Sequence, residues 1–178
     1  MKGEARHRAR EVALQVLFAL DLQERSRRDA SEAAALEARS DEAGAASEPS
    51  EGEAARSAGN LSAEDAESAF AAVAAHFELP HAAEEFAREL VSGTVEARDL
   101  VDRLISDHAR NWRVERMAVV DRNVLRLAAY ELARTDTATA VVLDEAVELA
   151  RRFGGDPSPA FVNGVLDALA ASIRVEAG

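Results

Sequence analysis

The 178-residue chain has no cysteine. Disulfide frameworks, thiolate metal sites and thiol nucleophiles are therefore excluded, and the composition suits a reducing compartment. Only four prolines are present, and the aromatic residues are six Phe, one Tyr and one Trp, whereas Ala, Leu, Glu and Arg are abundant. Because these abundant residues favour helices and no segment alternates with the period of a strand, we expect an all-α fold.

A long apolar run is also missing. No stretch approaches the roughly 20 apolar residues that a membrane-spanning helix needs. The basic N-terminus is followed by an apolar stretch, as in a signal peptide, but Glu11, Gln15 and Asp21 interrupt it and no small-residue cleavage site follows. We therefore expect a cytoplasmic protein that makes no membrane contact.

Sequence signatures of enzymes are absent as well. The chain contains no nucleophile turn of the G-x-S-x-G type, no Walker loop and no dinucleotide-binding glycine motif. No two of its four histidines have the i, i+4 spacing that places two metal ligands on one face of a helix. We predict no catalytic residue, no metal site and no cofactor.

Helical periodicity accounts for most of the remaining chain. Apolar residues recur at helical spacing in seven segments: 5–24, 62–77, 82–97, 100–108, 115–134, 139–153 and from residue 158 onward. Ser62 and Ser158 occupy N-cap positions, and Pro159 follows at the first helical position. Trp112 lies in a connector, where we expect it to pack over neighbouring helix ends. The sequence predicts one domain, residues 1–178, built as a bundle of about seven helices.

Residues 27–60 interrupt this pattern. Ala, Ser, Glu, Asp, Gly and Arg dominate the segment, and Leu36 is its only large apolar residue. Such a segment buries too little apolar surface to offset the entropy of ordering it. We expect an acidic, disordered insertion between the first and second helices, with at most a frayed helix over residues 32–39.

The charge is unevenly distributed. A net charge of −12 disfavours nucleic-acid binding when it is taken over the whole chain. Residues 1–28, however, hold seven basic and four acidic side chains, for a local charge of +3. From the first turns of a helix, whose dipole adds positive field, several of these groups can reach phosphates. The alternative is a solvated helix end with ordinary charges. The candidate residues are Lys2, Arg6, His7, Arg8 and Arg10.

A Gly- and Pro-containing loop between the last two predicted helices is a second candidate. Phe153 and Phe161 bracket this loop. Exposed rings beside free backbone N–H groups would suit unpaired nucleic acid, whereas the alternative is that both rings seal the join between the helices. Gly164 lies inside the last helix, where it lowers helix stability by about 1 kcal/mol relative to Ala. A close approach of another helix backbone or of a ligand would explain why a glycine stands at position 164.

Three further residues have two interpretations each. Asp121 and Arg122 lie within the most apolar predicted helix, where they can form a local ion pair or contact a protein partner. Phe18 lies on the same stripe of the first helix as Arg6 and Arg10, because the three residues are separated by multiples of four. There it can contact a ligand or partner, or it can join the core.

Four stretches, taken in order, resemble the NusB family. They are RHRAREVALQVLF at 6–18, MAVVDRNVLRLAAYEL at 117–132, VLDEAVELARRF at 142–153 and FVNGVL at 161–166. The last stretch, followed by Asp167, is particularly specific. The resemblance covers nearly all of the chain outside residues 25–60.

This resemblance implies an RNA-binding adaptor of bacterial transcription antitermination. In the family, an arginine-rich N-terminal segment binds single-stranded boxA RNA. The protein pairs with NusE, a small-subunit ribosomal protein, and loads a complex with other Nus factors onto RNA polymerase during rRNA transcription. The resemblance assigns RNA contacts to Lys2, Arg6, His7, Arg8, Arg10, Phe153 and Phe161. It places Phe18, Asp121 and Arg122 at or beside the NusE interface.

Two positions depart from some family members. His7 stands where some have an arginine, so that one phosphate contact is weaker or depends on pH. Phe18 stands where some members have a tyrosine, and this replacement removes a hydroxyl hydrogen bond while it keeps the aromatic ring. The acidic insertion is the main departure, and we hypothesise that it competes with phosphate for the RNA site.

Two other functions agree with parts of the sequence. A domain of this kind also occurs at the N-terminus of some rRNA cytosine methyltransferases, but those need a further cofactor-binding domain that no residues after 178 supply. The chain could also be a protein-binding helical module, in which a homodimer buries the arginine face. Sedimentation with and without boxA RNA distinguishes this module from the adaptor.

Overall fold

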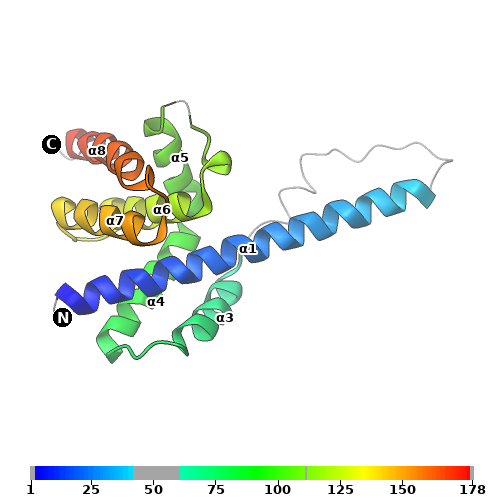
Figure 1. Cartoon of the computed structure of the whole chain (residues 1–178), viewed down its shortest axis with the longest axis horizontal. Coiled ribbons are helices and arrows are strands. Elements are labelled where there is room, and N and C mark those ends of the chain that lie inside the picture. The colour runs from blue at the N-terminus through cyan, green and yellow to red at the C-terminus, as the bar shows by residue number, and fades with distance from the viewer. Residues whose placement is uncertain (1–2, 42–60, 111, 177–178) are drawn as a thin grey trace.

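The computed structural model describes residues 3–41, 61–110 and 112–176. Over these residues the chain forms seven α-helices and one short 3-10 turn, with no strand, which confirms the all-α prediction (Figure 1). The helices are α1 (Gly3–Asp41), α3 (Ala63–Ala74), α4 (His81–Glu96), α5 (Arg98–His108), α6 (Val119–Arg134), α7 (Thr139–Phe153) and α8 (Ser158–Glu176), and the turn η1 is Val114–Arg116.

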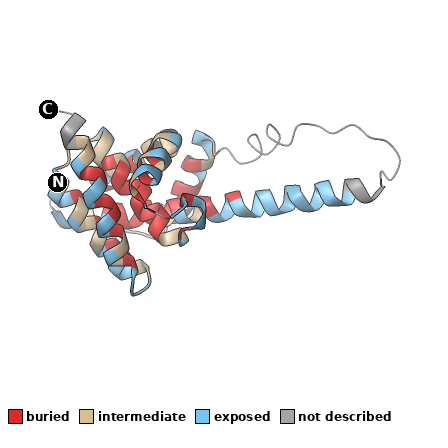
Figure 2. Ribbon diagram, turned by 90° about the horizontal axis from the view of Figure 1, so that it is seen from above, coloured by how far each residue is buried: buried red, intermediate tan, exposed pale blue. Residues whose placement is uncertain are grey.

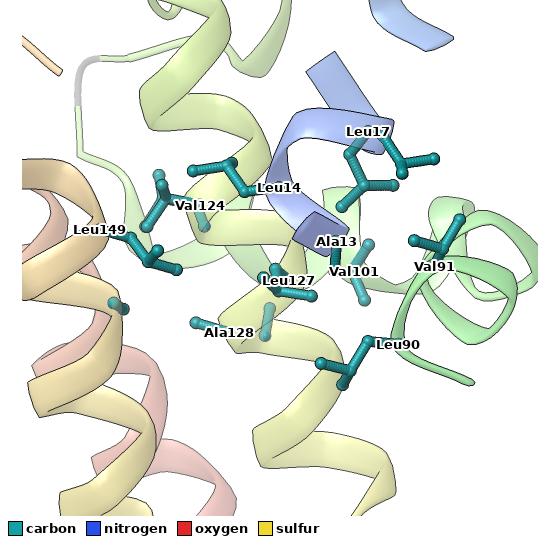
Figure 3. Close-up of a cluster of buried hydrophobic side chains, with 14 of the residues drawn as sticks. Ala13, Leu14, Leu17, Leu90, Val91, Val101, Val124, Leu127, Ala128 and Leu149 are labelled. Carbon is teal, nitrogen blue, oxygen red and sulfur yellow. The ribbon is translucent and has the colours of Figure 1, made fainter. Parts of the chain in front are cut away.

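Helix α6 lies at the centre of the bundle. Ten of its 16 residues are buried, and it packs against α1, α4, α5, α7 and α8. Figure 3 shows Val124, Leu127 and Ala128 of α6 among apolar side chains of the surrounding helices, including Leu14 and Leu149. The single segment predicted at 115–134 is divided into η1 and α6, so the connector before α6 is longer than the periodicity indicated.

Helix α1 is longer than the sequence analysis predicted. Its first part packs in the bundle, whereas residues 25–37 are all exposed and extend away from it (Figure 2). The expected disorder is therefore wrong over residues 27–41, and residues 42–60 lie outside the described part of the chain. The packed half of α1 supplies the helix nucleus, and the Ala, Glu and Arg of the exposed half favour adding further turns.

The start of α3 is fixed by a capping box. The Ser62 hydroxyl accepts a hydrogen bond from the Asp65 N–H, and the Asp65 carboxylate accepts one from the Ser62 N–H. This confirms the predicted N-cap. Arg27 of α1 donates to the same carboxylate at 2.6 Å. The hydrogen bond from Arg27, with those from Ser62, holds the pKa of Asp65 well below its usual range.

A buried carboxylate joins α1 to α6. Asp21 accepts hydrogen bonds from Arg122, from Asn123 at 3.1 Å and from Arg126 at 3.3 Å, and Arg98 of α5 lies 3.8 Å away. Burial alone would raise the pKa of Asp21, but the hydrogen bond and charge of Arg122, with the charges of Arg126 and Arg98, hold it below the ordinary value. The cluster neutralises charges that would be costly to bury singly.

Candidate nucleic-acid interface

Two cations of the first helical turns are exposed on α1. Arg6 has its guanidinium carbon 5.2 Å from the centroid of the Phe86 ring, a cation–π contact that orients the side chain. Arg8 is 53% exposed, and its only ion pair among the described residues is with Glu11 at 3.7 Å. At 3.7 Å this contact is too long for a hydrogen bond, and the Arg8 guanidinium stays open to solvent, so both arginines can contact phosphate. Lys2 lies outside the described residues.

Arg10 is not part of this exposed surface. Its side chain is only 2% exposed and donates two hydrogen bonds to the Glu131 carboxylate of α6, at 2.8 and 2.7 Å. Its remaining nitrogen, Nη1, lies 3.8 Å from Glu145 of α7. The prediction that Arg10 contacts RNA is therefore wrong for this structure, because a phosphate cannot reach the guanidinium.

His7 lies between two carboxylates. Its Nδ1 is 2.7 Å from Glu145, and its Nε2 is 3.2 Å from Glu11. Either nitrogen would have to leave a carboxylate before it could donate to a phosphate. The geometry supports a role for His7 in joining α1 to α7 rather than the direct RNA contact that the sequence suggested.

Arg152 adds a cation that the sequence analysis missed. It lies in the last turn of α7, is 52% exposed and forms an ion pair with Glu11, which is buried. Its guanidinium carbon is 5.3 Å from the centroid of the Phe153 ring. The position immediately before Phe153 was the available signal. Arg8 and Arg152 thus project outward from the buried Glu11 carboxylate with which both pair. The guanidinium groups face solvent and the carboxylate does not, so positive charge lies at the surface although negative charge lies beneath it.

An open groove follows these residues between α1 and α7. It has a volume of about 530 Å³. Two arginines line it together with two acids, one of which is buried: the lining residues are Glu4, Ala5, His7, Arg8, Glu11, Pro80 and Arg152. A groove with exposed guanidinium groups on two walls suits a phosphate backbone that runs along it.

The two phenylalanines that bracket the 154–157 loop are half-buried. Phe153 and Phe161 both pack on the core, which supports the sealing role, but each keeps an exposed portion. Phe153 contacts Arg152 as described above. Phe161 contacts Trp112, with ring centroids 5.4 Å apart and the planes at 59°. The expected packing of Trp112 is thus found against the first turn of α8, yet the indole remains 54% exposed.

The loop between these rings is a tight turn. The Gly155 N–H donates to the Ser158 hydroxyl at 3.0 Å, and the Ser158 N–H donates back to the Gly155 carbonyl. A Cβ at Gly154 would lie 2.6 Å from the Ala150 carbonyl oxygen, so a side chain there is excluded. Gly164 is exposed, and no atom of the residues that the structure describes lies within 4 Å of the position of a Cβ there. A contact with another helix backbone therefore does not explain Gly164, and a ligand remains the hypothesis.

The residues predicted to face a protein partner are not brought together. Phe18 is 36% exposed and lines an open, mainly apolar groove of about 490 Å³ between α1 and α3. Asp121 and Arg122 are both buried, and Arg122 is held by Asp21 and by two carbonyl groups of η1. The prediction of a partner contact is wrong for Arg122, whose role is structural. Asp121 has one buried oxygen, Oδ1, that accepts no hydrogen bond from the described part of the chain.

The described residues contain neither a metal site nor a membrane-spanning helix. No group of three or more His, Asp or Glu side chains there is arranged to hold a metal ion. No helix in the same residues combines the length and the hydropathy that crossing a membrane requires.

Comparison with known proteins gives consistent matches. The chain is 49% identical over 90 residues to a transcription antitermination protein NusB of Nitratiruptor sp., a match that spans 51% of this chain and 65% of that relative. The fold matches the T. maritima NusB structure with 31% identity and a TM-score of 0.64, over 93% of this chain and 90% of that one. A structure of the antitermination factors NusB and NusE with double-stranded RNA shares the fold at 23% identity, with a TM-score of 0.64 over 96% and 99% of the two chains.

The family model carries the assignment. The model of the NusB family matches residues 53–171, more than half of the chain, which includes α3 to α7 and most of α8. The exposed arginines of α1 lie outside the matched range. The chain belongs to the NusB family.

Proposed function

We propose that this protein is an RNA-binding adaptor of transcription antitermination, which binds single-stranded boxA-type RNA together with NusE. The named relative is a transcription antitermination protein, not an enzyme. A structural neighbour holds NusB and NusE with double-stranded RNA. Both findings support a function in which contacts recruit partners and no bond is made or broken.

One observation carries the proposal: two exposed arginines, Arg8 and Arg152, line one groove above the buried Glu11 carboxylate, and Arg6 adds a third exposed cation on α1. Arg6 and Arg8 come from α1 and Arg152 from α7, and Phe153 lies against Arg152. The guanidinium groups would bind phosphates and so provide affinity, whereas Phe153 and Phe161 would contact bases and so provide sequence preference.

The partner surface that we propose for NusE is the apolar groove beside Phe18. Its lining is mainly apolar and includes Val73 and Phe77 of the α3 region. This groove is separate from the arginine-lined groove, which would allow RNA and protein to bind together. RNA polymerase and other Nus factors would then be contacted indirectly, during rRNA transcription in the cytoplasm.

The experiment is a titration of boxA RNA and of a scrambled RNA against wild type and Arg6→Ala/Arg8→Ala, with and without NusE. We expect the double variant to bind both RNAs at least tenfold more weakly at low salt, since it loses two phosphate contacts. The matched control is Arg27→Ala/Arg28→Ala, which removes the same charge from the exposed half of the same helix. Equal losses in the two variants would contradict the proposal.

Self-association is tested in the same samples. If a homodimer buries the arginine face, sedimentation will show a dimer that RNA does not dissociate, and Arg6→Ala/Arg8→Ala will shift the dimer equilibrium instead of the RNA affinity. That outcome would favour the protein-binding module over the adaptor.

A further inference from the structure

The connector between α5 and α6 presents an aromatic ring that the proposed RNA groove does not use. Trp112 is 54% exposed, although an indole normally buries most of its large apolar area. Its contact with Phe161, at 5.4 Å and 59°, supports one part of the ring and fixes its orientation. The rest of the ring faces solvent.

Cations accompany this ring. Residues 108–116 hold three arginines and one acid, a local excess of two positive charges in a chain of −12. Arg110, Arg113 and Arg116 are all exposed, and none has an ion pair with another residue in the described parts of the chain. Arg113 and Arg116 line an open groove of about 580 Å³ with Trp112, and Glu115 is the one acid in its wall.

The backbone beneath these side chains is held in place. The Arg122 guanidinium donates to the carbonyl groups of Val114 and Glu115, at 3.4 and 3.3 Å, and Arg122 is itself fixed by Asp21 at 2.5 Å. Val114 is buried. The η1 turn that carries Arg116 and follows Arg113 is therefore held in place before any ligand binds, which lowers the entropy cost of binding.

A sequence of contacts joins this connector to the arginine-lined groove. Arg152 pairs with Glu11 at the groove and lies over Phe153. The four-residue loop 154–157 then leads into α8, where Phe161 contacts Trp112. A strand that leaves the groove past Phe153 would therefore meet Phe161 and then Trp112.

We propose that Trp112, with Arg113 and Arg116, forms a second binding subsite, which stacks an unpaired nucleotide of the same RNA and contacts its flanking phosphates. The inference rests on the proposed function and adds a site beyond the α1 groove. An exposed indole flanked by unpaired guanidinium groups is the arrangement that binds single strands, because every base has a face for stacking. A duplex offers no free base face along its length, so unpaired RNA is the ligand.

The chain contains one tryptophan, so intrinsic fluorescence reports on this subsite alone. We would titrate wild type with a boxA RNA and with the same RNA carrying six unpaired nucleotides at either end, and with a duplex of the longer RNA. We expect one of the extended RNAs to quench Trp112 fluorescence and to bind about 5- to 160-fold more tightly than the short RNA, the range of one stacked base.

Variants separate stacking from folding. Trp112→Ala should lose the advantage of the extended RNA and bind the short RNA as wild type does, whereas Trp112→Phe, which keeps a stacking ring, should retain most of the advantage. Arg113→Ala/Arg116→Ala should lower the salt slope for the extended RNA by about 1.4. Arg27→Ala/Arg28→Ala is the charge-matched control and should leave the salt slope for the extended RNA unchanged.

The outcomes distinguish this subsite from the function on which it rests. If short and extended RNAs bind equally and the fluorescence does not change, while affinity still depends on Arg6 and Arg8, the subsite is refuted and the proposed function stands. If wild type binds no RNA, both fall. If NusE alone quenches Trp112 and RNA does not, the surface is a protein contact and the inference is wrong.

Discussion

Arg10 and Glu131 form a buried, two-point ion pair between the first helix and the central one. The two hydrogen bonds are 2.8 and 2.7 Å long, and each side chain is 2% exposed. This pair separates the arginines of α1 into two classes, since Arg10 stabilises the bundle while Arg6 and Arg8 face solvent.

Replacing Arg10 should therefore affect stability and not RNA recognition. Arg10→Ala leaves the Glu131 carboxylate buried without its partner, which costs about 3–5 kcal/mol of unfolding free energy. Urea denaturation measures this loss, and Arg8→Ala is the matched exposed control, with an expected change below about 0.5 kcal/mol. Equal stability of the two variants would contradict the assignment of Arg10 to the core.

The Asp21 cluster predicts a specific pH dependence. The folded pKa of Asp21 lies below its ordinary value of 3.8, so its stabilising contribution is fully present above that pH and is lost as pH falls through the folded pKa. The side chain in Asp21→Asn carries no charge at any pH, so this pH-dependent contribution to stability is absent from the variant. We expect the variant to be markedly less stable than wild type at pH 7, with the difference narrowing below about pH 4. A difference that is constant from pH 7 to pH 3 would refute this.

Two glycines in helices should respond oppositely to Ala. At Gly93 an added Cβ would clash with the Tyr130 hydroxyl, whereas at Gly164 it would meet no atom of the described residues within 4 Å. Gly164→Ala should stabilise the fold by about 0.5–1 kcal/mol through helix propensity, and Gly93→Ala should destabilise it by about 1–3 kcal/mol through overpacking. The midpoints of thermal unfolding of both single variants, and of the double variant Gly93→Ala/Tyr130→Ala, test these two predictions. Relief of the strain in the double variant is expected.

The Gly164→Ala variant also tests the ligand hypothesis for that position. If RNA approaches the α8 backbone there, the variant will bind boxA RNA more weakly although it is more stable. Unchanged RNA affinity would remove Gly164 from the RNA surface.

Phe18 should be required for NusE and not for folding. Since the ring is 36% exposed in its groove, Phe18→Ala is expected to weaken NusE binding roughly tenfold, as truncation of an aromatic anchor does. Binding of RNA alone and the unfolding midpoint should change little. Leu36→Ala, on the exposed half of α1 at 70% exposure, is the control. Calorimetric titration of NusE into each variant gives the answer, and equal affinities for Phe18→Ala and wild type would exclude this groove as the interface.

The bundle could be predicted from sequence because its helices carry local signals. Helical spacing of apolar residues and the cap at Ser62 placed most elements to within a few residues, whereas Ser158, predicted as an N-cap, is the first residue of α8. The exposed half of α1 was missed because it has no apolar stripe. Its helicity comes from propensity and from continuity with a packed helix, which a burial argument does not detect.

The site was less predictable because its members depend on distant partners. Arg10 looked like Arg6 and Arg8 in the sequence, and only Glu131, 121 residues away, removes it from the surface. Arg152 is marked in the sequence only by its position before Phe153, and its place in the site follows from its contact with Glu11. Local spacing indicates which face of a helix a residue occupies, and tertiary packing decides which faces remain exposed.

The most direct test of the account is the salt dependence of boxA RNA affinity. For wild type, the plot of log Kd against log salt should be steep, and Arg6→Ala/Arg8→Ala should lower its slope by about 1.4, at about 0.7 per lost phosphate contact on a single strand. Arg27→Ala/Arg28→Ala should leave the slope unchanged. A slope in Arg6→Ala/Arg8→Ala that equals the wild-type slope would show that the exposed cations of α1 do not contact the RNA backbone, and it would contradict the central claim.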